Sequence, residues 1–205
     1  MSLKILLLVH DLSDAAVHRR AVMLRAGGAS VTVAGFRRTA KPVAEVAGCS
    51  AVDLGRTYNE RFAQRILAIV REAALIGRLR AVFTDADIIV ARNLEMLALA
   101  VQGHSLCRLA PVVVYECLDI HRLLLRRDFI GAALRRLEGW FSWRASALFT
   151  SSPAFVSGYF KALSEVRLPV RQVENKMADL GGGTAISRYV GGRSPGPPWV
   201  IGWSA

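Results

Sequence analysis

Two acidic side chains and a histidine follow a short apolar run in the middle of the chain. Residues 112–115 (VVVY) form the run, and Glu116, Asp119 and His121 come soon after it. An apolar run bounded by a turn signal is typical of a buried strand in a parallel sheet, and ligands bind at the carboxyl ends of such strands. Carboxylates and an imidazole can orient a hydroxyl group and stabilise developing charge. We therefore predict that these three residues are catalytic. The alternative is that Asp119 caps a helix and His121 is an ordinary surface residue.

Polar side chains also occur at or soon after the ends of three other apolar runs, at residues 4–9, 86–91 and 146–150. Because the carboxyl ends of parallel strands meet at one edge of a sheet, these side chains are candidates for binding substrate there. Helix capping is an alternative explanation for several of them, since Asp, Asn and Ser side chains accept hydrogen bonds from the first N–H groups of a helix. The candidates are Asp11, Asp14, Arg19, Arg92, Asn93, Ser151 and Ser152.

Alternating strands and helices would position these residues. Strands are expected at 4–9, 30–35, 86–91, 111–115, 146–150 and 170–173, with another short strand within 43–54. Helices are expected at 15–26, 59–79, 93–103 and 154–163. This order predicts an α/β fold with a doubly wound, mostly parallel sheet of about six or seven strands. The strand at 4–9 would lie at the centre, beside the strand at 87–91 across the switch point.

The composition narrows the class of protein. The chain has 205 residues, of which 53% are hydrophobic, so it is not a disordered chain. No apolar window reaches the roughly 18 uncharged residues that a transmembrane helix needs. The cysteines Cys49, Cys107 and Cys117 are far apart and form no CxxC motif. Neither a disulfide framework nor a metal site is predicted, and a reducing cytosol fits this cysteine usage.

The chain is strongly basic, with a formal net charge of +11. Such a charge suits a polyanionic partner, either nucleic acid, an acidic membrane surface or phosphate groups, although a solvated arginine-rich surface explains it equally well. Nucleic acid is not predicted, because the sequence contains no zinc-finger, RNP or helix-turn-helix signal. The segment 122–144 combines arginines with Trp140 and Trp143 on an amphipathic pattern. This combination predicts a helix at an anionic membrane surface, or else a core helix with an exposed arginine face.

Five segments spanning roughly residues 3–176 resemble the N-terminal domain of GT-B glycosyltransferases of family 4. They read KILLLVHDLSDAAVHRRAVMLRAGGASVTVAGF, ADIIVARNLEMLALA, VVVYECLDIHRLL, SALFTSSPAFVSGYF and LPVRQVENK. The later segment PPWVIGW is similar to the first strand of that family's second domain. The resemblance divides the chain into a Rossmann-like domain at 1–176, a Gly/Pro-rich linker at 177–198 and the apparent first strand of a second domain at 199–205.

The resemblance implies two Rossmann-like domains that face each other across a cleft. The second domain of such enzymes binds most of the nucleotide-sugar donor, and the N-terminal domain carries the acceptor site. Members are typically retaining and independent of metal, so the resemblance implies a nucleotide-sugar as donor substrate and no cofactor. Relatives commonly place a histidine or an acidic group near the transferred sugar, as at His121 and Asp119. The glycines that many relatives have after the first strand are absent here, and so is a GxGxxG fingerprint.

These observations predict the N-terminal, acceptor-side domain of a hexosyl-type glycosyltransferase. The whole enzyme would transfer a sugar from a nucleotide-sugar to a polysaccharide or lipid-linked acceptor, in the cytoplasm or peripherally at the inner face of the membrane. The alternative is a non-catalytic Rossmann-like module that binds a phosphate-bearing ligand or a partner protein. A nucleotide-dependent epimerase or dehydrogenase is disfavoured by the absent glycine fingerprint.

Overall fold

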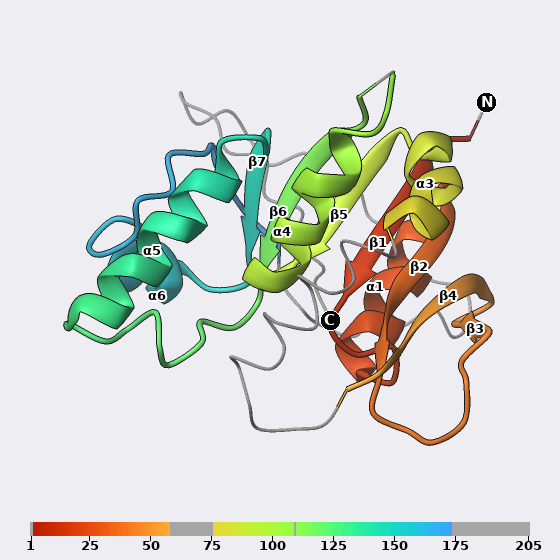
Figure 1. Ribbon diagram of the computed structural model, residues 1–205, viewed down its shortest axis with the longest axis horizontal. Helices are drawn as coiled ribbons and strands as arrows, with labels where there is room; N and C mark the ends of the chain where they lie inside the picture. The colour runs from red at the N-terminus through yellow and green to blue at the C-terminus, as the bar shows by residue number, and fades with distance from the viewer. Residues whose placement is uncertain (1, 58–75, 109, 174–205) are drawn as a thin grey trace, which may run out of the picture.

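The computed structural model describes residues 2–57, 76–108 and 110–173, and these form a sheet with helices on its faces (Figure 1). The eight-stranded sheet has the order β3-β4-β2-β1-β5-β6-β7-β8, and every neighbouring pair is parallel except β3 and β4. The strands are β1 (Lys4–Val9), β2 (Ser30–Arg37), β3 (Glu45–Val46), β4 (Cys49–Arg56), β5 (Ile88–Arg92), β6 (Val112–Cys117), β7 (Ala147–Thr150) and β8 (Val170–Gln172). The helices are α1 (Ala15–Ala26), α3 (Ile76–Asp85), α4 (Asn93–His104), α5 (Phe129–Ser142) and α6 (Pro153–Phe155), which continues into the π-helical η1 (Val156–Phe160).

The predicted fold class is confirmed. Strand β1 lies at the centre, paired with β2 on one side and with β5 on the other, so the chain order reverses between β1 and β5. Close packing here requires Gly35, whose Cα lies opposite Val9, because a Cβ at this position would lie 2.3 Å from the Val9 carbonyl oxygen. The switch point of the sheet is therefore where the sequence places it, and a ligand is expected at the carboxyl ends of these strands.

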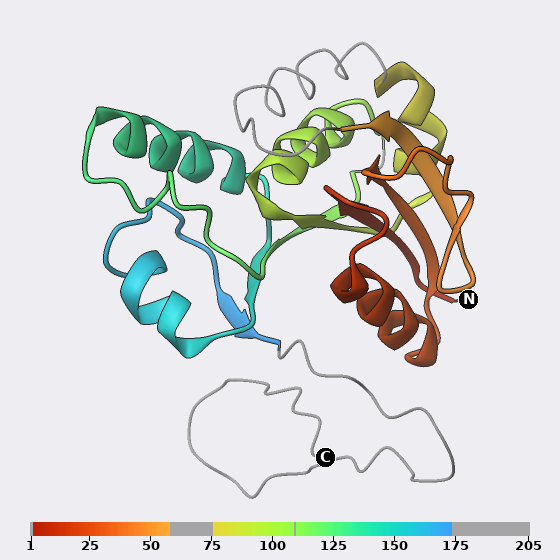
Figure 2. The same cartoon turned by 90° about the horizontal axis from the view of Figure 1, so that it is seen from below.

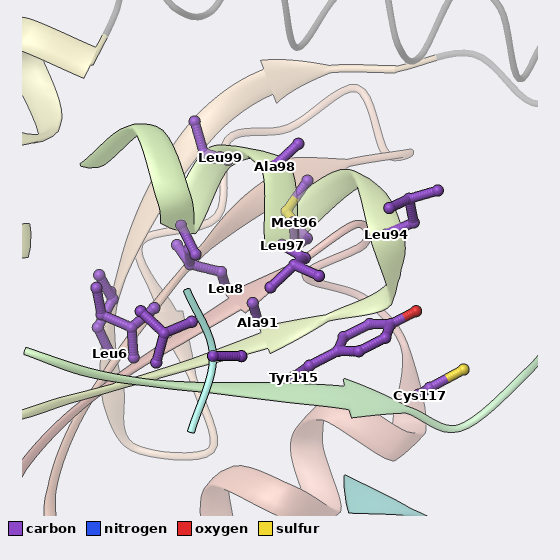
Figure 3. Packing of buried hydrophobic residues seen from close by; sticks show 14 of the residues in the cluster. Leu6, Leu8, Ala91, Leu94, Met96, Leu97, Ala98, Leu99, Tyr115 and Cys117 are labelled. Carbon is purple, nitrogen blue, oxygen red and sulfur yellow. The ribbon is translucent and has the colours of Figure 1, made fainter. Parts of the chain in front are cut away.

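Two apolar clusters lie on opposite faces of the sheet. Helix α1 covers one face, and helices α3 and α4 cover the other (Figure 2). Figure 3 shows Leu6, Leu8 and Ala91 of the strands gathered beside α4, whose Leu94 and Leu97 belong to the same cluster. The apolar runs of β1 and β5 are almost continuous because these strands are buried on both faces.

Several element boundaries differ from the predicted ones. The single short strand expected within 43–54 is a hairpin of β3 and β4, whose turn residues Ala47 and Gly48 have φ of 54° and 72°. The sequence signal was weak because an alanine seldom occupies a position with positive φ. Most of the helix expected at 59–79 lies outside the described residues, and within them α3 runs from Ile76 to Asp85. The helix expected at 154–163 is a short α-helical turn followed by the π-helical segment η1.

The basic stretch at 122–144 is not one helix. Residues 122–125 form a turn, and α5 begins only after Asp128, whose Oδ1 accepts a hydrogen bond from the Gly131 N–H at 3.0 Å. A side-chain cap three residues before a backbone donor is a strong start signal, and it fixes where the helix begins. The turn leaves the segment that follows β6 free to form one wall of a pocket.

A buried carboxylate joins α5 to the strand that precedes the pocket. Glu138 is 0% exposed and accepts hydrogen bonds from the hydroxyls of Tyr115 (2.8 Å), Tyr159 (2.6 Å) and Ser164 (2.9 Å). Burial raises the pKa of Glu138 above its usual value, although the three hydroxyl donors oppose that shift. The same burial raises the pKa of Tyr115 well above its usual value. This network fixes α5 and η1 against β6.

Candidate functional site

A pocket of about 380 Å³ opens at the carboxyl ends of β1, β5 and β6, at the switch point of the sheet. Its volume is within the range of small-molecule sites. Polar side chains from the segments that follow these strands line most of it. The lining residues are His10, Asp14, Ala16, Arg38, Arg92, Asn93, Leu94, Glu95, Tyr115, Leu118, Asp119, His121 and Leu124.

The segment between β1 and α1 contributes His10 and Asp14. Asp14 is the N-cap of α1, as predicted, and its Oδ1 accepts a hydrogen bond from the Ala16 N–H at 2.8 Å. Asp14 therefore both caps α1 and lines the pocket. Its capping bond fixes the carboxylate at the pocket wall, with its second oxygen available to a ligand.

The junction of β5 and α4 contributes Arg92 and Asn93, and here the alternative explanation, that Asn93 caps the helix, is wrong. Arg92 is the N-cap residue of α4, with no capping side chain, and Asn93 has a φ of 69°. Asparagine tolerates this left-handed conformation better than most residues do. The Asn93 amide therefore does not cap the helix. Its Nδ2 instead lies 3.5 Å from the Nδ1 of His10, which also lines the pocket.

The turn after β6 contributes Asp119 and His121. Asp119 does not cap the next helix, because Asp128 does. The Leu123 N–H donates a hydrogen bond to Nδ1 of His121 at 3.3 Å. In its neutral form the ring therefore carries its proton on Nε2. Asp119 is exposed, so its carboxylate accepts hydrogen bonds from solvent or from a ligand.

Glu116 lies within β6 rather than in the turn, and it does not line the pocket. Its carboxylate is 0% exposed and lies between two buried arginines. Oε2 accepts a hydrogen bond from Nε of Arg92 at 2.7 Å, and Oε1 lies 2.8 Å from Nη2 of Arg20. A carboxylate enclosed in this way has no free access to a substrate. We therefore assign Glu116 to holding the arginines, in place of the predicted catalytic role.

The other predicted residues do not line the pocket. Asp11 is buried and lies 2.8 Å from Nε of Arg38, and it also accepts hydrogen bonds from the backbone and hydroxyl of Ser13. Ser152 caps α6, and the hydroxyl of Ser151 donates to the Leu118 carbonyl at 3.5 Å. Arg19 lies on α1, outside the pocket lining.

Sequence reasoning named neither His10 nor Arg38 as a binding residue. Arg38 directly follows β2, the strand beside β1, so the rule that ligands contact strand ends identifies it once the strand order is known. His10 is the first residue after β1, and the same rule applies to it.

Within the described ranges, no group of three or more His, Cys, Asp or Glu side chains is arranged to hold a metal ion. Among the same residues, no helix has the length and apolar character needed to cross a membrane. The hydrogen-bonding groups around the pocket comprise carboxylates, an amide, imidazoles and guanidinium groups. This set can bind the hydroxyl groups of a polar organic substrate.

Comparison with known proteins gives one close sequence relative. No protein-family model matches the chain. The chain is 45% identical over 203 residues to the succinoglycan biosynthesis protein ExoL of Rhizobium meliloti (strain 1021), an alignment that covers 98% of this chain and 50% of ExoL. The chain thus spans about half the length of this curated relative.

Solved structures with similar folds are much more distant in sequence. Sucrose-phosphate synthase from Thermosynechococcus elongatus superposes with a TM-score of 0.64 at 10% identity, covering 84% of this chain and 48% of the synthase. UGT2 from Phytolacca americana superposes with a TM-score of 0.53 at 11% identity, covering 84% of this chain and 51% of UGT2. A putative UDP-N-acetylglucosamine 2-epimerase from Listeria monocytogenes gives 0.51 at 12% identity, covering 80% of this chain and 44% of that protein. The chain therefore has the fold of one Rossmann-like half of a GT-B-type protein.

Proposed function

We propose that this chain is the acceptor-side domain of a GT-B glycosyltransferase that transfers a hexosyl group from a nucleotide-sugar to a polysaccharide or lipid-linked glycan. The observation that carries the proposal is the pocket at the switch point of the sheet, whose lining suits a hydroxylated substrate. The similarity to a protein of succinoglycan biosynthesis supports a glycan as the product. The proposed setting is the cytoplasmic side of a membrane.

The proposed chemistry uses residues of the pocket and a nucleotide-sugar held largely by a second domain. His121 would donate a hydrogen bond from Nε2 to an oxygen that gains negative charge, and Asp119 and Asp14 would accept hydrogen bonds from acceptor hydroxyls. The proposed enzyme retains the configuration of the sugar and needs neither a metal ion nor a cofactor. The predicted linker at 177–198 and the strand at 199–205 lie outside the described residues.

A chimera tests this function. The part of ExoL that this chain matches would be replaced by the chain itself, and the hybrid expressed in a Rhizobium meliloti strain that lacks ExoL. We expect succinoglycan production to be restored, because the 45% identity extends over 98% of the chain. A hybrid that accumulates to normal levels without restoring production would contradict the proposal. That result would favour a module that binds a phosphate-bearing ligand without catalysis.

We further propose that α5 lies against an anionic membrane surface. Phe129, Arg136, Trp140 and Trp143 recur at spacings of seven, four and three residues, which places them on one side of the helix. Phe129, Trp140 and Trp143 are 81%, 64% and 77% exposed. Exposed aromatic rings combined with basic side chains suit the headgroup region of a bilayer. The opposite side of α5 packs on the core through residues such as Glu138.

We expect the protein to co-sediment with phosphatidylglycerol-containing vesicles at low salt and to be released at high salt, because each basic residue near the surface contributes about 1 kcal/mol, or roughly fivefold in partitioning. Exchanging Trp140 and Trp143 for serine together should reduce binding without unfolding, since both side chains face solvent. Arg80→Gln, an exposed substitution on α3, is the control. Failure to bind at low salt, or equal binding by the tryptophan variant, would remove this proposal.

A further inference from the structure

We propose that Arg92 and Asn93 form a donor–acceptor pair that binds a sugar hydroxyl in the pocket, and that Arg20 and Glu116 are positioning residues for Arg92. The ligand class in this inference rests on the proposed function. The roles of the residues rest on hydrogen-bond accounting in the structure. Arg92 and Asn93 are consecutive, both line the pocket, and both have a buried polar atom without a partner among the described residues.

The guanidinium group of Arg92 is held by Glu116 through Nε, while its Nη1 has no hydrogen-bond partner among the described residues. The residue is 2% exposed. Its Nε donates to Glu116 Oε2 at 2.7 Å, and its Nη2 lies 3.5 Å from the Ala16 carbonyl oxygen. Its Nη1 is buried with no hydrogen-bond partner in the part of the chain that is described. An unpaired buried donor is destabilising, so an acceptor on a ligand at Nη1 would recover that energy.

Asn93 supplies the complementary group. Its backbone has a φ of 69°, a conformation uncommon outside glycine, and the helix gains no cap from its side chain. Its Oδ1 is buried and, among the described residues, unpartnered. Unusual backbone conformations of this kind are concentrated at binding sites, where they aim a particular side chain. A hydroxyl group accepts one hydrogen bond and donates another, so it matches an N–H donor beside a carbonyl acceptor.

Arg20 and Glu116 hold Arg92 in this orientation. The Cα atoms of Arg92 and Glu116 are partners in the β5–β6 register, so the two side chains are neighbours on the sheet. Arg20 reaches the other carboxylate oxygen from α1 as an ion pair, with Nη2 lying 2.8 Å from Oε1 without the geometry of a hydrogen bond. The carboxylate is therefore held from both sides, and Arg92 has little freedom to rotate away from the pocket.

The charges around the pocket favour a neutral ligand over an anion. The lining contains two arginines, Arg38 and Arg92, and three carboxylates, Asp14, Glu95 and Asp119. The first of these arginines already lies 2.8 Å from a buried carboxylate, that of Asp11. A phosphate group would meet more negative than positive charge here, whereas the hydroxyl groups of a sugar can donate to the carboxylates.

Proton–nitrogen NMR of the full chain tests the inference. The Nε–Hε signal of Arg92, assigned by its loss in Arg92→Lys, is followed while methyl glycosides of the common hexoses or inorganic phosphate are added. We expect at least one glycoside to shift this signal with a millimolar dissociation constant, and phosphate to leave it in place. Arg92→Lys lacks this signal, so its glycoside binding is followed on the backbone N–H signals that the glycoside shifts in the wild type. The variant keeps the charge but loses the Nη groups, and it should weaken glycoside binding about tenfold. Arg136→Lys, at an exposed arginine that lies 3.8 Å from Glu165, should bind like the wild type.

Glu116→Gln separates positioning from direct contact. Glycoside affinity should fall while the rest of the spectrum keeps its dispersion, and the Arg92 Nε–Hε signal should move before any ligand is added. The inference is overturned if no glycoside shifts the Arg92 signal, if phosphate alone shifts it, or if Arg92→Lys binds as tightly as the wild type. Because these measurements need only the chain and a sugar, they are independent of whether the ExoL hybrid restores succinoglycan production.

Discussion

Replacing Glu116 by alanine is expected to lower the free energy of unfolding by about 3–5 kcal/mol, because removing one partner of a buried ion pair leaves uncompensated charge in the core. Two arginines, Arg20 and Arg92, would lose their carboxylate at once, and the side chains of this cluster are at most 8% exposed. A loss of this size is a large share of the roughly 5–15 kcal/mol that stabilises a typical domain.

Denaturant unfolding followed by circular dichroism measures this effect. Glu116→Gln keeps the shape and one oxygen acceptor, so its loss should be smaller than that of Glu116→Ala. The matched control is Asp85→Ala, which removes a carboxylate whose Oδ1 lies 2.5 Å from Nζ of Lys4 at the surface. Its unfolding midpoint should remain close to that of the wild type, because exposed ion pairs contribute little. If Glu116→Ala unfolds at the same midpoint as this control, the ion pairs of Glu116 with Arg20 and Arg92 do not stabilise the fold.

Replacing His121 by alanine in the ExoL hybrid is expected to reduce sugar transfer about 10²–10³-fold, the usual effect of removing one donor that stabilises developing negative charge. The reason is the hydrogen bond from the Leu123 N–H to Nδ1, which places the proton of the neutral ring on Nε2. Transfer of radiolabelled sugar from a nucleotide-sugar to membranes of the strain that lacks ExoL would measure the rate.

Two further variants make this test specific. His121→Gln, whose amide can donate in place of Nε2–H, should recover part of the rate. His18→Ala, at an exposed histidine of α1, should transfer sugar like the unmodified hybrid. Near-normal transfer by His121→Ala would show that the histidine is not part of the catalytic machinery, and it would leave the carboxylates of Asp14 and Asp119 as the remaining candidates.

The two predictions concern Glu116 in β6 and His121 in the turn after it, which have different surroundings. Strand side chains alternate between faces, so Glu116 lies on the same face as Val114, which belongs to the cluster under α1. Tyr115 lies on the other face, under α4. Past the end of the strand this alternation stops, and Asp119 and His121 lie at the pocket. The alanine substitution should therefore act mainly on stability at Glu116 and mainly on activity at His121.

Much of the architecture was predictable because it depends on local pattern. The apolar runs of β1 and β5 required burial on both faces, and helical segments between strands required parallel pairing. The end of β1 and the end of β5 therefore had to meet at the switch point. For the same reason Asp14, Arg92, Asn93, Asp119 and His121 could be named as pocket candidates before any coordinates were known, and the structure places all of them in its lining.

The sequence by itself thus determined that β1 lies at the centre beside β5 and that the segments after these strands share an edge of the sheet, because these features follow from periodicity and chain connection. Only the tertiary structure decided which polar side chains are buried in the core. Arg20, Arg92 and Glu116 come from three elements distant in sequence, and their pairing depends on side-chain direction, register and the helix that covers each face. Such ion pairs depend on distances of a few ångströms, and a linear pattern carries no information at that scale.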